Sequence, residues 1–191
     1  MRKLSYYAAT TADGYIAGPN GSLDCFLPGG EHLTDLVRRY PETIPSHLWE
    51  ALGVRQTGTK FDTVLMGRRT CEPAWKAGIA SPYQHLRQYV FSRSVTVSPD
   101  SGIELVASDP VAKVRMLKEE QGLGIWLCGG GELATALAGE IDELILKINP
   151  TLAGGGTRLF AGEVQPAALK LVEQVTYLNG VLLVHYRVDR D

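Results

Sequence analysis

The sequence lacks the signatures of several protein classes. Its three cysteines, Cys25, Cys71 and Cys128, form neither a CxxC pair nor an even-numbered disulfide framework. Lys and Arg total 19 against 21 Asp and Glu, so no basic field would attract nucleic acid. No run approaches the roughly 20 apolar residues that cross a bilayer, and Asp13 interrupts the N-terminal run that a signal peptide would need. We therefore expect a cytoplasmic protein with no nucleic-acid partner and no membrane partner.

Motifs that would hold a catalytic metal or nucleophile are also missing. The four histidines do not have the spacing of metal ligands, so we expect no bound metal. The sequence contains no G-x-S-x-G elbow, no P-loop and no H-x-E signature of the zinc deaminases. It therefore does not support a serine hydrolase, a P-loop NTPase or a zinc deaminase.

Strand and helix signals alternate along most of the chain. Short apolar runs between turn signals predict strands at 4–9, 63–66, 89–91, 125–128 and 144–148. Helical spacing is found at 31–52 with breaks at Pro41 and Pro45, at 110–122 behind the cap Asp109, and at 132–137. Asn179-Gly180 predicts a hairpin between strands at 169–178 and 181–188.

This alternation predicts an α/β sandwich with a mostly parallel mixed sheet and a C-terminal antiparallel hairpin. The chain has 191 residues, of which 45% are hydrophobic and 21% charged, values typical of one globular domain. We find no repeat, linker or low-complexity tract. We therefore expect a single domain over residues 1–191.

Three of the predicted strands end in polar or glycine-rich residues. Gly67-Arg68-Arg69-Thr70 follows one strand, Ser92-Arg93-Ser94 a second, and Gly129-Gly130-Gly131 a third. The carboxyl ends of parallel strands meet at one edge of a sheet, where ligands commonly bind. Glycines let the backbone approach a pyrophosphate, and the planar fork of arginine suits phosphate. This combination indicates a site for a phosphorylated dinucleotide, and an arginine near the ribose favours NADPH over NADH.

A standard Rossmann domain is disfavoured, although Gly129, Gly131 and Ala134 satisfy the G-x-G-x-x-A spacing. The acidic residues that follow, Asp142 and Glu143, open the next strand instead of ending it, where a ribose partner belongs. The glycine run also lies late in the chain. The alternative to a ligand site is a tight turn at the glycines, with ordinary surface ion pairs at the arginines.

The order of these segments resembles the dihydrofolate reductase family. The three strand ends, the last continuing into Glu132-Leu133, are similar to the cofactor-binding segments of those enzymes. The segments 8–17, 141–144 and 150–156 are more similar to the reductase domain of the bacterial riboflavin-biosynthesis deaminase-reductase. The resemblance covers nearly the whole chain, and 31–61 matches least. It implies a dihydrofolate reductase-like three-layer sandwich.

The resemblance also implies an activity: an NADPH-dependent oxidoreductase that transfers a hydride to a small heterocyclic acceptor, pterin- or pyrimidine-like, or to a carbonyl acceptor. It assigns the cofactor to Ala9, Ile16, Gly67, Arg68, Thr70, Ser92, Arg93, Gly129, Gly130, Gly131, Glu132 and Leu133. The implied substrate pocket lies between the loop at 24–26 and the helix after Pro28. Asp24, Phe26 and Trp49 are its candidate substrate-binding residues.

The predicted pocket departs from that of dihydrofolate reductases. Those enzymes have a carboxylate shortly after a Leu-Pro pair, and alignment on Leu27-Pro28 places Gly30 at that position. Asp24 and Glu31 are the candidate catalytic residues for proton transfer. Alternatively, Asp24 caps a turn and Glu31 starts a helix. The missing carboxylate argues against dihydrofolate itself as the substrate.

Two other functions remain open. One keeps the fold but takes a ribosylamino-pyrimidine, whose phosphate would need basic residues such as Lys60 and Arg158. The other is a non-catalytic nucleotide-binding or regulatory domain on the same fold. In each case the apolar terminal hairpin and the glycine-rich turn after Pro150 offer edge surfaces, which predict a homodimer.

Overall fold

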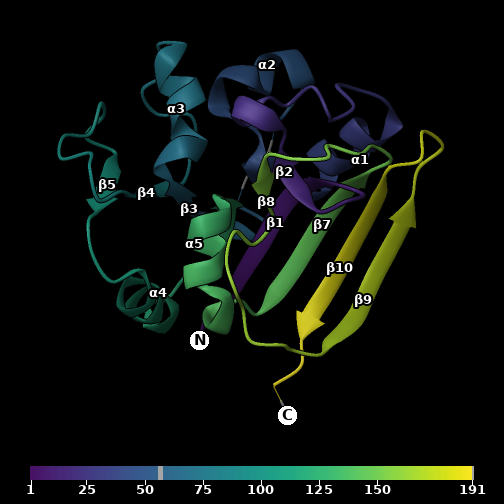
Figure 1. Ribbon diagram of the computed structural model, residues 1–191. Coiled ribbons are helices and arrows are strands. Elements are labelled where there is room, and N and C mark those ends of the chain that lie inside the picture. The colour runs from purple at the N-terminus through teal and green to yellow at the C-terminus, as the bar shows by residue number, and fades with distance from the viewer. Residues whose placement is uncertain (56–57, 191) are drawn as a thin grey trace.

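The computed structural model describes residues 1–55 and 58–190 and contains one large and one small sheet (Figure 1). The large sheet has the strand order β5-β4-β3-β6-β1-β7-β10-β9. Its strands are β1 (Leu4–Thr11), β3 (Phe61–Gly67), β4 (Arg87–Phe91), β5 (Ile103–Val106), β6 (Gly124–Gly129), β7 (Glu143–Asn149), β9 (Leu169–Thr176) and β10 (Leu182–Val188). The small sheet pairs β2 (Tyr15–Ala17) with β8 (Thr157–Arg158).

The large sheet is parallel from β5 through β7, and the terminal hairpin joins it in the antiparallel direction. Most residues of β1, β3, β6 and β7 are buried, as expected for parallel strands covered on both faces. The predicted α/β architecture with its mostly parallel sheet and closing hairpin is confirmed.

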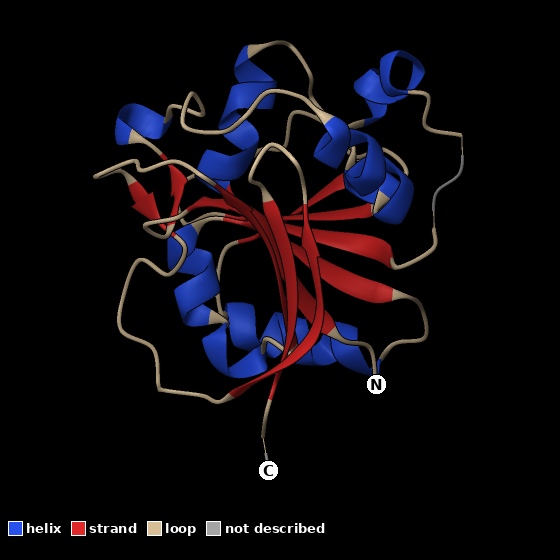
Figure 2. Ribbon diagram, turned by 90° about the vertical axis from the view of Figure 1, so that its right-hand side faces the viewer, coloured by secondary structure: helices blue, strands red, loops and turns tan. Residues whose placement is uncertain are grey.

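Helices cover both faces of the sheet, giving three layers (Figure 2). The helices are α1 (Glu31–Arg39), α2 (Trp49–Leu52), α3 (Arg68–Lys76), α4 (Pro110–Glu119) and α5 (Gly131–Ala136). Short 3-10 turns occupy Pro19–Gly21, Pro41–Thr43, Ser46–Leu48 and Ala138–Glu140. No helix in the described part of the chain is long and apolar enough to span a membrane.

Each face of the sheet has its own hydrophobic core. On one face, Leu36 of α1 and Cys71 of α3 pack against strand residues that include Trp126. On the other face, Leu117 of α4 and Ala134 of α5 pack against β1, β3 and β6. The helices pack against the sheet from both sides, and this packing fixes the positions of the strand ends.

Several elements differ from the sequence-based predictions, among them the small sheet of β2 and β8, which the sequence analysis did not predict. The helix α3 starts at Arg68, directly after β3, in a stretch where the sequence analysis predicted no helix, and it contains Pro73. The edge strand β5 was not predicted from the sequence. It is short and contains exposed Glu104. The helix α4 ends at Glu119, whereas Gly122 was expected to close it. Its predicted start is confirmed, because the Asp109 carboxylate accepts the backbone N–H of Ala112 at 2.9 Å.

A buried carboxylate connects the segment after α1 to the beginning of β3. Glu42 is fully buried, and its Oε1 accepts the backbone N–H groups of Lys60 at 2.5 Å and Phe61 at 2.8 Å. These donors come just before and at the start of the strand, where a neighbouring strand cannot satisfy them. The Glu42 side chain therefore helps to fix where β3 begins.

Replacement of Glu42 by Ala is expected to lower the free energy of unfolding by about 2–3 kcal/mol, because it leaves buried donors unpaired. Glu42→Gln, which keeps a carbonyl acceptor, is expected to lose less. Urea unfolding measures both. The matched control is Glu50→Ala on the exposed side of α2, and equal effects of E42A and E50A would contradict the role of Glu42.

Candidate cofactor and substrate site

The carboxyl ends of β3 and β6 approach each other through glycines. Met66 is the register partner of Gly129, and an added Cβ at Gly130 would lie 3.5 Å from the Gly67 Cα and 3.6 Å from the Thr70 Oγ1. Gly129 and Gly130 have φ values of +153° and +99°, a region that other residues rarely adopt. The approach of the two strand ends therefore depends on the glycines.

Two helices begin at this junction without a capping side chain. Gly67 is the N-cap of α3 and Gly130 is the N-cap of α5, and neither helix start has a side-chain cap hydrogen bond. The first N–H groups of a helix have no partner within the helix. The junction therefore offers backbone donors of the kind that bind phosphate.

An acidic residue at the start of α5 lies between two arginines from other strand ends. The Glu132 carboxylate is 3.6 Å from Arg69 Nη1 and 4.0 Å from Arg93 Nη2. The side chains are highly exposed, 75% for Arg69 and 91% for Arg93, so these pairs are weak. The contacts bring the predicted residues Arg93 and Glu132 together, and they add Arg69, which the sequence analysis did not assign.

The predicted residue Arg68 points along its own helix. Its guanidinium pairs with Glu72 one turn later in α3, and its side chain is 37% exposed. Adjacent helical residues project in different directions, so Arg68 and Arg69 have different neighbours. If α3 had been predicted from the sequence, the different directions of the Arg68 and Arg69 side chains could have been predicted as well.

The remaining residues predicted at this edge contact the protein itself. The Ser92 hydroxyl accepts the N–H of Val95 at 2.9 Å and shapes the turn after β4. Gly131 lacks space for a side chain because the backbone carbonyl of Arg158 lies against it. Leu133 is buried in the core. At these positions the backbone is the part of the residue that could meet a ligand.

The loop after β1 is attached to the loop after β7 by Asp13. Its carboxylate accepts the Thr11 hydroxyl at 2.5 Å and the backbone N–H groups of Ala153 at 3.0 Å and Gly154 at 2.8 Å. These bonds, that of Thr11 first, lower the pKa of Asp13 from 3.8 to about 2. The structure thus gives Asp13 a role in shaping the loop that carries β2.

Two predicted nicotinamide contacts lie on either side of this loop. Ala9 is in β1, half-buried, and its register partner in β7 is Lys147. Ile16 is in β2 and packs against the core on the α5 side of the sheet. Both residues therefore flank the carboxyl end of β1.

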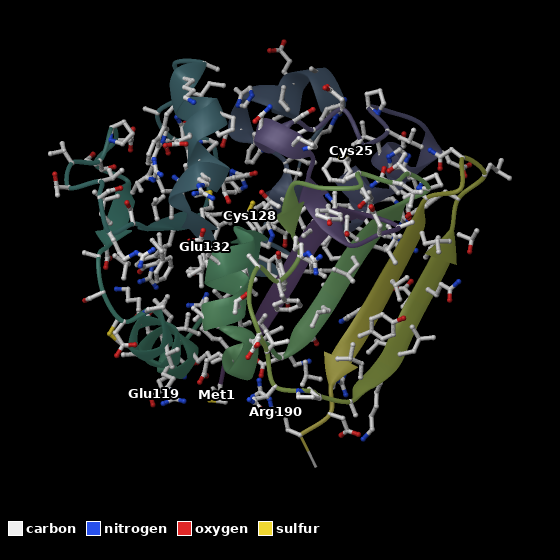
Figure 3. All side chains as sticks on the ribbon, viewed as in Figure 1. Met1, Cys25, Glu119, Cys128, Glu132 and Arg190 are labelled. Carbon is white, nitrogen blue, oxygen red and sulfur yellow. The ribbon has the colours of Figure 1, made fainter. Side chains whose placement is uncertain are left out.

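The loop that leads into α1 is held above the end of β7. The Leu27 N–H donates to Asn149 Oδ1 at 3.1 Å, and the Thr151 hydroxyl donates to the Cys25 carbonyl at 2.6 Å. Phe26 lies half-buried between these two attachments. In Figure 3, Cys25, Cys128 and Glu132 all lie nearer the top of the view than Met1 and Arg190, which lie near the bottom.

The two candidate catalytic carboxylates bond locally. Asp24 is exposed and accepts the Ser22 hydroxyl at 2.6 Å. Glu31 is the first residue of α1, is exposed, and accepts the backbone N–H of Leu178 in the tip of the hairpin. These contacts fit the alternative roles stated in the sequence analysis, in which Asp24 caps a turn and Glu31 starts a helix.

The third substrate candidate, Trp49, packs beside His85. Its indole Nε1–H donates to the Ile44 carbonyl at 2.9 Å, and its ring centre lies 4.4 Å from that of His85. Trp49 is half-buried, while Trp126 is buried in the sheet core. Trp49 thus forms part of the packing around α2.

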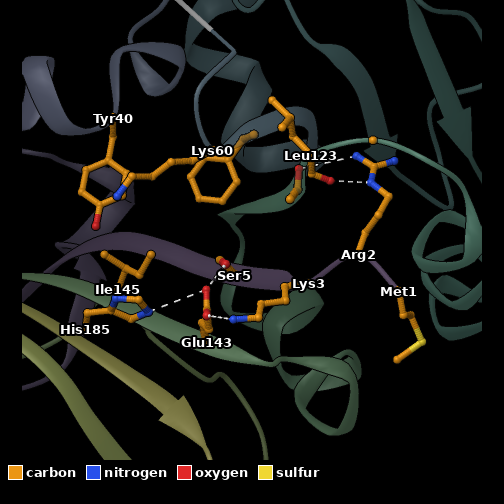
Figure 4. Close-up of a pocket in the computed structure, with 13 residues that line it drawn as sticks. Met1, Arg2, Lys3, Ser5, Tyr40, Lys60, Leu123, Glu143, Ile145 and His185 are labelled. Atoms are coloured by element: carbon orange, nitrogen blue, oxygen red, sulfur yellow. Dashed lines mark hydrogen bonds and ion pairs between the residues drawn. The ribbon is translucent and has the colours of Figure 1, made fainter.

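A cavity of about 400 Å³ lies at the opposite edge of the sheet (Figure 4). It is lined by residues at the amino ends of β1, β3 and β7, including Ser5, Lys60 and Glu143. Glu143 accepts Lys3 at 2.6 Å and Ser5 at 2.9 Å. Lys60, a candidate for a substrate phosphate, is in this cavity and is separated from the glycine junction by the length of β3. Lys60 therefore cannot contact a ligand that is bound at the carboxyl ends of the strands.

The comparisons with known proteins agree with this architecture. Residues 2–183 match the family described as RibD C-terminal domain. A Bacillus subtilis protein named uncharacterized protein YwjB is 30% identical over 187 residues, which cover 97% of each chain.

Solved structures show the same fold. A putative riboflavin biosynthesis protein from Shewanella sp. PV-4 superposes with a TM-score of 0.73 at 23% identity, with 100% of both chains covered. Dihydrofolate reductase from Enterococcus faecalis, complexed with NADP(H), superposes with a TM-score of 0.68 at 17% identity over 98% of this chain and 96% of that one. The predicted dihydrofolate reductase-like sandwich is confirmed.

The pKa of Asp13 leads to a test of its structural role. A carboxyl whose pKa is lower in the folded state stabilises the fold above pH 3.8 or so, and this contribution disappears as the pH falls to about 2. Asp13→Asn is therefore expected to lower the Tm at pH 7, with a difference from wild type that shrinks between pH 4 and pH 2. A difference in Tm that is the same at both ends of this range would contradict the assignment.

The match over residues 2–183 covers nearly the whole chain and supports a reductase-type activity. The glycine junction and the loops at the carboxyl edge lie within the matched residues. The chain belongs to the RibD C-terminal domain family.

Proposed function

We propose that the protein is an NADPH-dependent reductase that binds its cofactor at the glycine junction of β3 and β6. The observation that carries the proposal is the convergence of three strand ends. The Gly67–Gly130 approach joins β3 to β6, and Glu132 lies between arginines that follow β3 and β4. Family membership supports a reductase-type activity.

The chemistry of the donors suits a dinucleotide with an additional phosphate. At the glycine junction no side chain covers the uncapped N–H groups of the two helix starts, and the Thr70 hydroxyl lies beside them, which is the chemistry that a pyrophosphate needs. Arg68, Arg69 and Arg93 follow the strands on the adenosine side of the implied cofactor. Arginine recognises phosphate through two parallel hydrogen bonds. These groups favour NADPH over NADH.

When bound, NADPH supplies the hydride, and the chain positions the cofactor and the acceptor. Ala9 and Ile16 flank the place where the nicotinamide is expected, at the carboxyl end of β1. The acceptor enters from the α1 side, beneath the loop held by Asn149 and Thr151. We propose a small heterocyclic or carbonyl compound as this acceptor.

Replacing Arg69 and Arg93 together by Ala is expected to weaken NADPH binding by roughly 1–3 kcal/mol, because charged hydrogen bonds to phosphate have this magnitude. NADH affinity is expected to change little. Titration of nicotinamide fluorescence measures both affinities. The control is Arg115→Ala in α4, an exposed arginine whose partner is Glu140.

Absence of NADPH binding by the wild-type protein at millimolar concentration would refute the proposal. Equal losses of NADPH and NADH affinity in the double variant would refute the phosphate recognition. A protein that binds NADPH but oxidises it with no acceptor in a broad panel would instead be a nucleotide-binding or regulatory domain.

We also propose a cytoplasmic homodimer that associates through the terminal hairpin. The edge strand β9 leaves Leu169, Leu171 and Val172 exposed by 43%, 58% and 48%. A long apolar edge of this kind is normally covered by another chain. A second copy of the same chain covers such an edge by two-fold symmetry.

Leu171→Lys is expected to convert the dimer into a monomer, because it places charge in the proposed contact. Light scattering after size-exclusion chromatography measures the mass. The control is Val97→Lys, which changes an exposed valine away from the hairpin. A monomeric wild-type protein, or a dimeric L171K protein, would contradict this interface.

A further inference from the structure

The sheet face beneath α1 contains a lysine at a position where packing alone would favour an apolar residue. Lys147 is in β7, two residues before the strand ends at Asn149. Because side chains alternate along a strand, Lys147 shares its face with the core residue Ile145. Strands covered on both faces normally have apolar residues at such positions. A charged residue there points to a use other than packing.

The ammonium group has an aromatic neighbour but no anionic one. Lys147 Nζ lies 4.5 Å from the centre of the Tyr7 ring, a cation–π distance. No hydrogen bond or ion pair joins it to another residue in 1–55 or 58–190. Within these residues, the fully enclosed side-chain nitrogens without partners belong to Arg2 and His185. The Lys147 ammonium is not among them, and the residue as a whole is half-buried.

The titratable groups that face Lys147 come from three elements. Tyr7 belongs to β1, Cys128 to β6 and His32 to α1. Burial lowers the pKa of Lys147 from 10.5 to about 8, while the nearby Cys128 opposes this shift. The pKa of His32 is lowered by burial and also by the Lys147 charge. An ammonium in this state loses its proton near pH 8, well below the pH at which a solvated lysine does.

The carboxylates around α1 are engaged elsewhere. Asp24 bonds to Ser22, and Glu31 bonds to the backbone of the hairpin tip. Asp35 accepts the Tyr177 hydroxyl at 2.7 Å and pairs with Arg39 at 2.6 Å. The sheet face beneath α1 thus presents a cation, Lys147, while Gly30 stands at the position where dihydrofolate reductases are expected to have a carboxylate.

We infer that Lys147 binds the oxygen of a carbonyl acceptor and donates the proton that this oxygen takes up on reduction. The inference rests on the proposed function and specifies its substrate class. Lys147 is the register partner of Ala9, so it lies one strand, about 4.8 Å, from the expected nicotinamide contact. This separation allows its four-carbon stem to reach the oxygen of an acceptor in hydride contact.

In the proposed step the carbonyl is reduced to an alcohol, and Lys147 supplies the proton. The carbonyl carbon gains a C–H bond with two electrons from the reduced nicotinamide, and the C=O π pair moves to the oxygen. The Lys147 N–H bond breaks as the new O–H bond forms, which gives an alcohol and a neutral amine. The amine then takes a proton from water. A cation at this point stabilises the developing negative charge, as an oxyanion site does.

The same charge disfavours another substrate class. A pteridine that is protonated on reduction would place positive charge near the ammonium in a partly buried site, where repulsion is poorly screened. The site therefore selects aldehydes, ketones or carbonyl-bearing pyrimidines, and it selects against cationic rings.

The first experiment does not depend on turnover. Reductive methylation with ¹³C-formaldehyde and cyanoborohydride labels accessible lysines, and NMR then follows each dimethylamine signal with pH. We expect one signal that titrates near pH 8 and is missing in Lys147→Arg and Lys147→Met. A Lys147 that formaldehyde does not modify, or that titrates with the surface lysines, would overturn the inference.

The second experiment separates the lysine from the cofactor site. Lys147→Met is expected to bind NADPH within about twofold of wild type, whereas NADPH oxidation with a panel of aldehydes and ketones falls roughly 10²- to 10⁴-fold, the usual effect of losing a general acid. Lys147→Arg is expected to retain part of the activity. The control is Lys76→Met, an exposed lysine at the end of α3.

The pH profile provides a further readout. Wild-type kcat is expected to fall above pH 8 or so, as the ammonium loses its proton, and this limb is expected to be absent from K147M. NADPH binding without oxidation by any carbonyl in the panel, or an unchanged pH limb in K147M, would overturn the inference. Failure of the wild-type protein to bind NADPH would instead overturn the proposed function.

Discussion

The parallel pairing of β1 with β6 on one side and β7 on the other is the constraint on which the site depends. The β1–β7 register runs without a break from Ser5–Glu143 to Thr11–Asn149. Both faces of β1 are buried, so a shift by one residue would exchange its two sets of side chains between the cores. The register therefore places Ala9 beside Lys147 and directs every neighbouring strand end to one edge.

Two kinds of cation lie near the carboxyl ends of the strands. Arg69 and Arg93 are exposed, so water solvates them and their pairing with Glu132 contributes little. They can exchange this partner for a phosphate at small cost. Lys147 is half-buried against Tyr7 and has lost much of its hydration. Its charge is stabilised most when an electron-rich oxygen comes beside it, which suits a group that acts during the reaction.

The opposite edge of the sheet shows why pairing matters. Glu143 is surrounded by His185, Lys3 and Ser5, whose contacts lower its pKa to about 2 (Figure 4). A cavity lies at these amino ends of the strands, but the donors around Glu143 already pair with its carboxylate. The carboxyl edge has the reverse arrangement, with uncapped helix starts and an ammonium without an anionic partner. The carboxyl ends therefore keep exposed or half-buried donors available to a ligand, whereas the acid of the cavity is already paired.

The sequence alone determined the α/β architecture and the order of the strand-end motifs, because apolar runs, caps and the Asn179-Gly180 turn act over a few residues. The sequence also pointed to Gly129 and Gly130 at a strand end, and the structure gives both residues positive φ values. Only the tertiary structure showed that Arg69 joins Arg93 at Glu132, and that Lys147 lies unpaired beside Ala9. These contacts join residues distant in the chain, and the direction of each side chain depends on a helix start or a strand register. Local sequence patterns contain neither.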